Sequence, residues 1–157
     1  EKSKQYFTFF NNPSVVVAAG WYGHLANKIN DNIYTTGEIV SFDKDPQCKK
    51  IGKKLYKDIK DIKFTDADIK YYDIKRFNIV ICTSCEHFEQ YIIDDFLKRR
   101  KKGSLVILQS NNYFSIKEHI NCHNSVIEFE KTLKLEKILY RGTLKLDKFD
   151  RYMVIGI

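Results

Sequence analysis

With 157 residues, 43% of them hydrophobic and 14% aromatic, the chain can bury one hydrophobic core and is too short for two. No apolar run is as long as a membrane span, and the first ten residues lack the order of a secretion signal, so we expect neither feature. We predict a single domain over residues 1–157, with 1–14 as an N-terminal extension. Because the sequence begins at Glu1 and not at Met, we expect processing or a longer parent chain before it.

The charge balance is basic, since 27 Lys and Arg against 20 Asp and Glu give a formal net charge of +7. Such a charge favours acidic partners without naming one, and a solubilising surface explains it at least as well. The four cysteines, Cys48, Cys82, Cys85 and Cys122, lack the paired spacing of small disulfide-bonded secreted domains. We therefore expect reduced thiols and a cytoplasmic protein.

Apolar runs bounded by turn residues alternate with longer amphipathic stretches, which is typical of parallel strands joined by helices. The predicted strands are 15–20, 39–43, 62–65, 77–83 and 104–109. The predicted helices are 23–30, 46–57, 89–102 and about 125–134. Pro46 suits a first helical turn, and Gly103 is a natural stop after the third helix.

The last third of the chain changes character. Residues 136–146 and 150–157 are both strand-like and are separated only by a short polar turn. Two strands this close in sequence can pair only as an antiparallel hairpin, because a parallel return needs a crossover of about a dozen residues. The sequence therefore predicts an α/β fold with a sheet of five parallel strands and a terminal antiparallel hairpin.

A glycine-bearing loop follows the first predicted strand. Its sequence AAGWYG has the spacing of G-x-G-x-x-G, with Ala18 in place of the first glycine. Gly20 would let the backbone approach a ligand or take a positive φ, and Gly23 would let the helix start pack near the strand. Taken alone, the loop is explained equally well as a tight turn.

Acidic residues end the next two predicted strands. Asp43 ends the second strand, where a carboxylate can accept both hydroxyl protons of a ribose. Asp45 is better placed than Asp43 to cap the following helix. Asp66 and Asp68 lie at the end of the third strand, where one of them could accept from the amine of adenine and the other could cap the turn. A glycine loop and acids on successive strand ends predict a pocket for an adenosine.

The glycine loop, the acids and the terminal hairpin together resemble the class I, Rossmann-like S-adenosylmethionine-dependent methyltransferases over nearly the whole chain. The resemblance implies a doubly wound sheet with the strand order 3-2-1-4-5-7-6 and S-adenosylmethionine as the cofactor. The glycine loop would lie against its methionine part, Asp43 would hold the ribose hydroxyls and Asp66 the adenine amine. The implied cofactor-binding residues are Ala19, Gly20, Trp21, Tyr22, Gly23, Asp43, Lys44, Asp66, Ala67, Thr83 and Ser84.

The methyl acceptor is expected at the loops that follow the fourth and fifth strands. Glu86, His87 and His119 are the candidate catalytic acid-base residues, although ordinary polar loop surface would also account for them. Tyr113 and Phe114 could form a wall for a flat acceptor or could pack in the interior.

The same loops carry residue types that zinc prefers: Cys85, His87, His119, Cys122 and His123. None of them shows the C-x-x-C pairing of a dedicated structural site. No metal ligand is therefore predicted from the sequence.

Nucleic acid receives weak support as a partner, and no membrane contact is expected. Residues 83–88 read TSCEHF, where DNA amino-methyltransferases carry an acidic or amide residue followed by two prolines and an aromatic. This argues against the base-flipping N-methyltransferases of the usual kind. The basic run KRRKK at 98–102 lies at a helix end, where a solvated face is its better explanation.

Three functional interpretations follow. The first is a methyltransferase acting on a small-molecule or macromolecular acceptor that the sequence does not identify. The second is a catalytically silent protein of the same fold that serves as a binding or stimulatory subunit. It is supported by the altered glycine motif, in which Val16 stands where an acid is frequent and Ala18 replaces a glycine, and by the missing signature after the fourth strand. The third is an NAD-dependent oxidoreductase domain, against which the terminal hairpin and the lack of room for a substrate domain both count.

Overall fold

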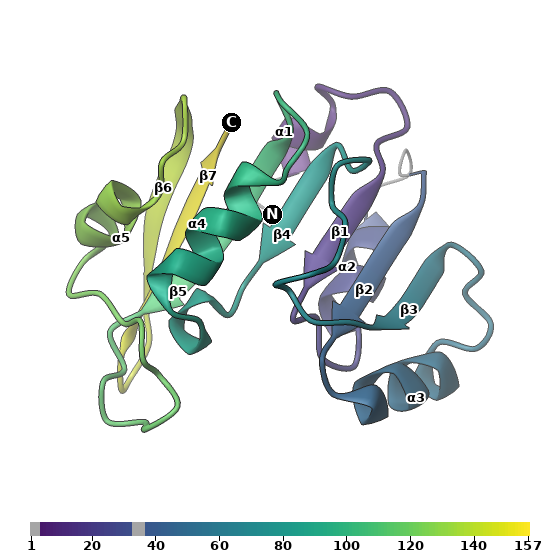
Figure 1. Cartoon of the computed structure of the whole chain (residues 1–157), viewed down its shortest axis with the longest axis horizontal. Coiled ribbons are helices and arrows are strands. Elements are labelled where there is room, and N and C mark those ends of the chain that lie inside the picture. The colour runs from purple at the N-terminus through teal and green to yellow at the C-terminus, as the bar shows by residue number, and fades with distance from the viewer. Residues whose placement is uncertain (1–3, 33–36) are drawn as a thin grey trace.

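The computed structural model describes residues 4–32 and 37–157. The chain folds into a seven-stranded sheet with helices on both faces (Figure 1). The strands are β1 (Val15–Ala18), β2 (Ile39–Asp43), β3 (Ile62–Asp66), β4 (Ile79–Cys82), β5 (Leu105–Asn111), β6 (Ile138–Lys145) and β7 (Asp150–Gly156). The helices are α1 (Lys4–Phe7), α2 (His24–Asn32), α3 (Pro46–Leu55), α4 (Gln90–Lys98) and α5 (Val126–Thr132), with a 3-10 turn η1 (Cys85–His87).

The strand order is β3-β2-β1-β4-β5-β7-β6. Strands β1 to β5 pair in parallel, and β7 lies antiparallel between β5 and β6. This confirms the predicted doubly wound α/β sheet, its order and its closing hairpin. The order reverses between β1 and β4, and at such a point the loops at the carboxyl ends of the strands diverge and leave a crevice for a ligand.

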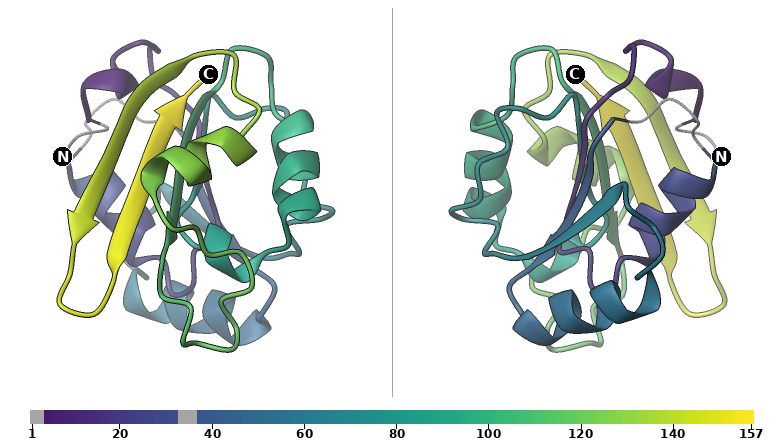
Figure 2. Two further views of the ribbon diagram at one scale, coloured as in Figure 1. Left: turned by 90° about the vertical axis from the view of Figure 1, so that its left-hand side faces the viewer. Right: turned by 90° about the vertical axis from the view of Figure 1, so that its right-hand side faces the viewer.

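The central strand is buried on both faces, as expected for a continuous apolar run in a parallel sheet. Its side chains alternate between two cores: Val16 belongs to the core that includes Phe96 of α4 and Phe129 of α5, and Val15 to the core that includes Ala26 of α2. Figure 2 shows α4 and α5 on one face of the sheet and α2 on the other. The two cores hold the strand ends, and therefore the loops beyond them, in fixed positions.

Several predicted strand bounds differ from those observed. The first strand ends at Ala18 and not at Gly20, because Ala19 takes a left-handed φ of 49° and cannot continue an extended chain. The fourth is shorter than predicted, at Ile79–Cys82. The fifth runs on to Asn111, because β7 keeps pairing with it and places Arg151 opposite Asn111.

Two arginines of the basic run at 98–102 donate hydrogen bonds to backbone carbonyls within the protein. Helix α4 ends at Lys98, earlier than predicted, and the Arg99 guanidinium donates to the backbone oxygens of Ile69 (2.6 Å) and Tyr72 (2.7 Å). Arg100 donates to its own helix at the carbonyl oxygen of Leu97 (2.7 Å). These bonds hold the segment between β3 and β4 against α4 and leave the two arginines poorly available to a phosphate backbone.

The predicted N-terminal extension contains α1, which the sequence analysis does not predict. Phe7 is buried in the core shared with β1 and α2, and the Tyr6 hydroxyl donates to the carbonyl oxygen of Leu139 on β6 (3.1 Å). The extension therefore packs against the sheet through Tyr6 and Phe7, and its residues 1–3 lie outside the described residues.

Over the described residues, none of the helices is long and apolar enough to cross a lipid bilayer. The four cysteines are free thiols, and three of them, Cys48, Cys82 and Cys85, are buried.

Candidate functional site

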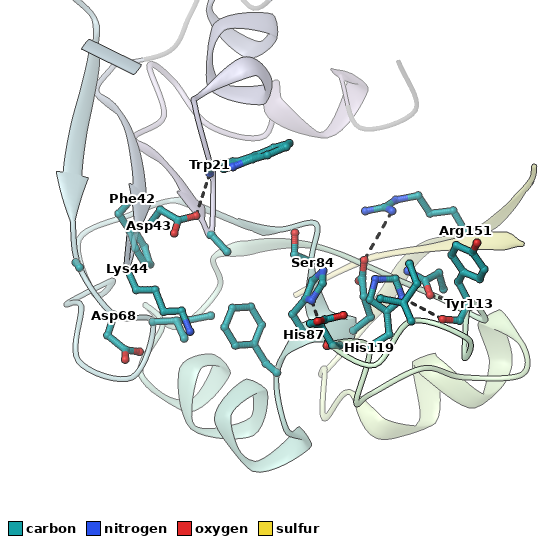
Figure 3. A pocket seen from close by; sticks show the side chains of 18 of the residues that line it. Trp21, Phe42, Asp43, Lys44, Asp68, Ser84, His87, Tyr113, His119 and Arg151 are labelled. Atoms are coloured by element: carbon teal, nitrogen blue, oxygen red, sulfur yellow. Dashed lines mark hydrogen bonds and ion pairs between the residues drawn. The ribbon is translucent and has the colours of Figure 1, made fainter. Parts of the chain in front are cut away.

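A cavity of about 750 Å³ lies at the carboxyl ends of the parallel strands, around the point where the strand order reverses. Five successive strand ends each contribute a lining residue: Ala19, Asp43, Ala67, Ser84 and Asn111. Figure 3 shows Trp21, Asp43 and Asp68 at one end of the cavity and His87, His119, Tyr113 and Arg151 at the other. The two ends correspond to the expected cofactor and acceptor sides.

The glycine loop turns through three residues with positive φ: Ala19 (49°), Trp21 (51°) and Gly23 (85°). Gly20 donates its N–H to the carbonyl oxygen of Phe42 (2.9 Å), and a Cβ on Gly20 would overlap the Ser41 hydroxyl. A side chain at position 20 would therefore force the Ser41 hydroxyl to move, and the atoms of Gly20 itself do not line the cavity.

The bulky residues of this loop stack on each other. The Trp21 and Tyr22 rings have centroids 4.7 Å apart at an interplanar angle of 21°. Trp21 lines the cavity with 62% of its surface exposed, and Tyr22 lies behind it, outside the lining. Of the loop residues expected to bind the cofactor, the structure therefore places Ala19 and Trp21 at the cavity.

Asp43 is held in place by two backbone donors. Its Oδ2 accepts from the N–H of Trp21 and its Oδ1 from the N–H of Asp45, both at 3.1 Å. The Asp45 carboxylate in turn caps α3 through the N–H of Gln47 (2.8 Å), as predicted. Each Asp43 oxygen keeps a lone pair for a further donor, so the side chain is a fixed acceptor at the cavity wall.

The two acids after β3 separate. Asp66 forms a 2.6 Å ion pair with Lys49 of α3, and the hydrogen bond from Lys49 lowers the pKa of the Asp66 carboxyl. Asp66 is not part of the cavity lining, whereas Asp68 is, with its Oδ1 accepting from the N–H of Lys70 (2.9 Å). Of the two acids, Asp68 therefore lies at the cavity wall, and Asp66 pairs with Lys49 outside the lining.

Of the other residues expected to bind the cofactor, Lys44, Ala67 and Ser84 line the cavity. Thr83 and Gly23 do not. The Thr83 carbonyl oxygen accepts a hydrogen bond from the Arg151 guanidinium. Gly23 lies against the ring of Phe64, which belongs to the core between the sheet and α2.

Glu86, His87 and His119 come together at the acceptor end (Figure 3). Glu86 and His87 belong to η1, and His119 lies in the loop after β5. The N–H of Asn121 donates to the carbonyl oxygen of Glu86 (3.0 Å) and ties the two loops together. The rings of His87 and His119 meet edge to face, with centroids 4.7 Å apart.

Both imidazoles are oriented by backbone carbonyls. His87 Nδ1 lies 3.2 Å from the carbonyl oxygen of Glu118, and His119 Nδ1 lies 3.1 Å from that of Tyr113. A carbonyl can only accept, so in both rings Nδ1 carries the hydrogen. In the neutral ring Nε2 then holds the lone pair, which can take a proton or bind a metal.

Glu86 is an unusual member of this cluster because it is buried, with 3% of its surface exposed. Its Oε1 lies 3.8 Å from Arg151 Nη1, a long ion pair. Among the described residues, Glu86 Oε2 has no hydrogen-bond partner. A buried carboxylate oxygen without a donor is costly unless a ligand completes it.

The aromatic wall differs in part from the one expected. Tyr113 lines the cavity and stacks on Phe149 from the turn between β6 and β7, with centroids 4.9 Å apart at 7°. Phe114 is 57% exposed and lies outside the lining. Phe149 and Arg151 are site residues that the sequence analysis misses, because only the pairing of β7 with β5 brings them to the cavity.

Three of the residues weighed as zinc ligands from the sequence, Cys85, Cys122 and His123, lie outside the cavity lining. The Cys85 thiol is buried and directed at the carbonyl oxygen of Cys82 (3.6 Å), and the Cys122 thiol at Asn111 Oδ1 (3.3 Å). His123 Nδ1 lies 3.3 Å from the Ser110 hydroxyl, and burial lowers the pKa of this imidazole.

No protein-family model and no curated protein matches the sequence. Solved structures match the fold. Magnesium protoporphyrin IX methyltransferase from Synechocystis PCC 6803 with bound S-adenosylhomocysteine gives a TM-score of 0.75 at 12% identity, over 97% of this chain and 77% of that one. N-methyltransferase NodS from Bradyrhizobium japonicum WM9, in complex with the same molecule, gives 0.74 at 11% identity, over 96% and 80%. The chain therefore has the fold of these methyltransferases, as the resemblance implies.

Proposed function

We propose that the protein is an S-adenosylmethionine-dependent methyltransferase. The cofactor is held by the glycine loop, Asp43 and the segment after β3, and the acceptor lies against the loops after β4 and β5. The observation that carries the proposal is one cavity with Asp43 fixed by two backbone N–H groups at one end and with the Glu86, His87 and His119 cluster at the other.

The cofactor end suits an adenosine. Its wall combines the apolar side chains of Phe42, Ala67 and Ile69 with the carboxylate of Asp68. A purine needs apolar surface against its faces and an acceptor for its exocyclic amine, and a ribose needs an acceptor for its hydroxyls, which Asp43 supplies. These residues fit S-adenosylmethionine, whose sulfonium supplies the methyl group.

The two departures from the common glycine motif do not obstruct this end. Val16 and Ala18 are fully buried in the core beneath α4, and neither lines the cavity. The reason for considering a silent subunit is therefore weakened. The NAD interpretation is disfavoured by the antiparallel β7 between β5 and β6, because the dinucleotide fold has the order 3-2-1-4-5-6.

Methyl transfer from a sulfonium is an in-line displacement: the bond from the acceptor to the methyl carbon forms as the carbon–sulfur bond breaks. Holding the three atoms collinear and near contact supplies much of the acceleration. An acceptor that carries a proton, such as a hydroxyl, also needs a group to take it. The Nε2 atoms of His87 and His119 are the ring nitrogens left to take a proton, because both Nδ1 atoms face backbone carbonyls, and the Tyr113 and Phe149 stack provides a flat wall.

The acceptor is a small molecule or a macromolecule with a flat or oxygen-bearing group. The four free thiols support a reducing compartment, the cytoplasm, as the place where the protein works.

Calorimetric titration of the purified chain with S-adenosylmethionine, S-adenosylhomocysteine and NAD tests the proposal. We expect both adenosyl compounds to bind one per chain and NAD to bind at least tenfold more weakly. Binding of NAD alone, or of none of the three, would contradict it. Methyl transfer to small molecules, proteins and RNA, followed with a labelled methyl group, then separates an enzyme from a silent subunit.

The two acids after β3 give a paired prediction. Replacing Asp68 with Asn is expected to weaken cofactor binding about fivefold to tenfold, the value of one hydrogen bond of about 1 to 1.5 kcal/mol. Asp66→Asn should leave the affinity within twofold, because Asp66 pairs with Lys49 away from the cavity. Calorimetry on both variants makes the comparison, and the reverse order of effects would return the adenine contact to Asp66.

A further inference from the structure

The acceptor end holds a set of metal-binding side chains. A ligand nitrogen from each of His87 and His119 and a carboxylate oxygen of Glu86 all lie within 4.8 Å of one another. Ligand bonds to a first-row cation are about 2.0–2.2 Å long, so small side-chain rotations would bring the three to coordination distance. Two imidazoles and one carboxylate are a common donor set for such cations, with positions left open for other ligands.

Both histidine rings already have the tautomer and the orientation that a metal at Nε2 requires. Metal-bound imidazoles usually donate their other N–H to a carbonyl or carboxylate, which fixes the ring and its tautomer. His87 and His119 both do this, to the carbonyls of Glu118 and Tyr113. The hydrogen bond from Asn121 to the Glu86 carbonyl holds the two loops together, so the ligands are positioned before anything binds.

The carboxylate supplies the second, independent sign of a ligand. Glu86 is 3% exposed, lines the cavity, and its Oε2 lacks a partner among the described residues. Arg151 does not meet this need, because its guanidinium stays 3.8 Å from the other oxygen and donates to Gln109 Oε1 (2.8 Å) and to the Thr83 carbonyl. A cation bound to the Glu86 carboxylate would give a partner to a buried group whose Oε2 has none among the described residues.

We propose that Glu86, His87 and His119 bind one divalent transition-metal cation of the zinc class. The imidazole ligands favour Zn²⁺ over Mg²⁺, which prefers oxygen donors. The set differs from the zinc ligands considered from the sequence, because a glutamate and not a cysteine completes it. Metal binding itself does not depend on the proposed methyl transfer. A bound cation would occupy the lone pairs of both imidazoles, so the acceptor would present an oxygen to the cation and would not pass its proton to His87 or His119. This consequence rests on the proposed function.

The test is a titration of metal-free protein, after chelator treatment, with ZnCl₂ by calorimetry and with CoCl₂ by visible absorption. We expect one Zn²⁺ per chain, and MgCl₂ binding at least 100-fold more weakly. His87→Gln, His119→Gln and Glu86→Gln should each weaken Zn²⁺ binding at least tenfold. Each variant's circular dichroism and melting are recorded without metal, to show that it is folded.

Two matched controls exclude other sites. His24→Gln removes an exposed histidine that contacts Tyr56 and does not line the cavity, and Cys122→Ser removes the one partly accessible thiol of the four; both variants should bind Zn²⁺ as the unaltered protein does. A thiolate charge-transfer band with Co²⁺, equal loss in His24→Gln, or no stoichiometric binding would overturn the proposal. The metal titration is done without S-adenosylmethionine. If the unaltered protein binds S-adenosylmethionine but not Zn²⁺, the metal site alone is refuted and the proposed function stands.

Discussion

Replacing Asp43 with Ala is expected to weaken S-adenosylmethionine binding about 100-fold. The carboxylate would accept the ribose hydroxyls, and hydrogen bonds to a charged group are worth about 1.5 to 3 kcal/mol each. A loss of about 3 kcal/mol corresponds to roughly two orders of magnitude in the dissociation constant. Asp43→Asn keeps one acceptor oxygen and should lose about tenfold. Calorimetry with S-adenosylmethionine and S-adenosylhomocysteine measures both.

Asp45→Ala is the control for this prediction. Asp45 lies two residues away and caps α3 through Gln47, so its loss should cost about 1 kcal/mol of folding stability and little affinity. Unchanged affinity in Asp43→Ala would show that the ribose is held elsewhere. Equal loss of affinity in both variants would mean that the Asp43→Ala effect comes through the loop and not through a contact with the ligand.

Replacing Gly23 with Ala should lower the free energy of unfolding by about 3 kcal/mol. Gly23 has a φ of 85°, where an L side chain costs about 1 kcal/mol or more, and its Cβ would overlap the ring of Phe64. Forcing extra carbon into a packed core adds about 1 to 3 kcal/mol. Urea unfolding followed by circular dichroism measures the change.

Gly103→Ala separates the two causes. Gly103 has a similar φ of 76°, and a Cβ there would meet nothing within 4 Å, so only the backbone term of about 1 kcal/mol should appear. Phe64→Leu combined with Gly23→Ala should recover part of the larger loss, because it removes the overlapping ring atoms. Equal destabilisation at the two glycines would refute packing against Phe64 as the reason for Gly23.

Features that depend on residues a few positions apart were predictable. Asp45 as the cap of α3, Pro46 at its first turn and the antiparallel hairpin all follow from local chain geometry, and the structure confirms them. The strand order follows from the resemblance to the methyltransferases and is confirmed as well. The placement of Asp43 at the cavity agrees with its position at the end of β2.

Features that depend on neighbouring elements were not predictable. The local sequence offers both Asp66 and Asp68 as acceptors, and the pairing of Asp66 with Lys49 on α3 becomes visible only in the structure. Phe149 reaches the cavity because β7 inserts beside β5, and no local pattern marks it.

Side-chain periodicity and strand direction are local properties, so the amino-acid sequence was enough to predict the buried strands, the turns, and the edge of the sheet that the glycine loop and the acids share. What those residues can do depends on contacts between segments far apart in the chain. The burial of Glu86 depends on distances between loops and strands far apart in the chain. The same holds for the carbonyl groups that face His87 and His119, and for the overlap with Ser41 that Gly20 avoids. Those distances are set by the packing of two cores around β1.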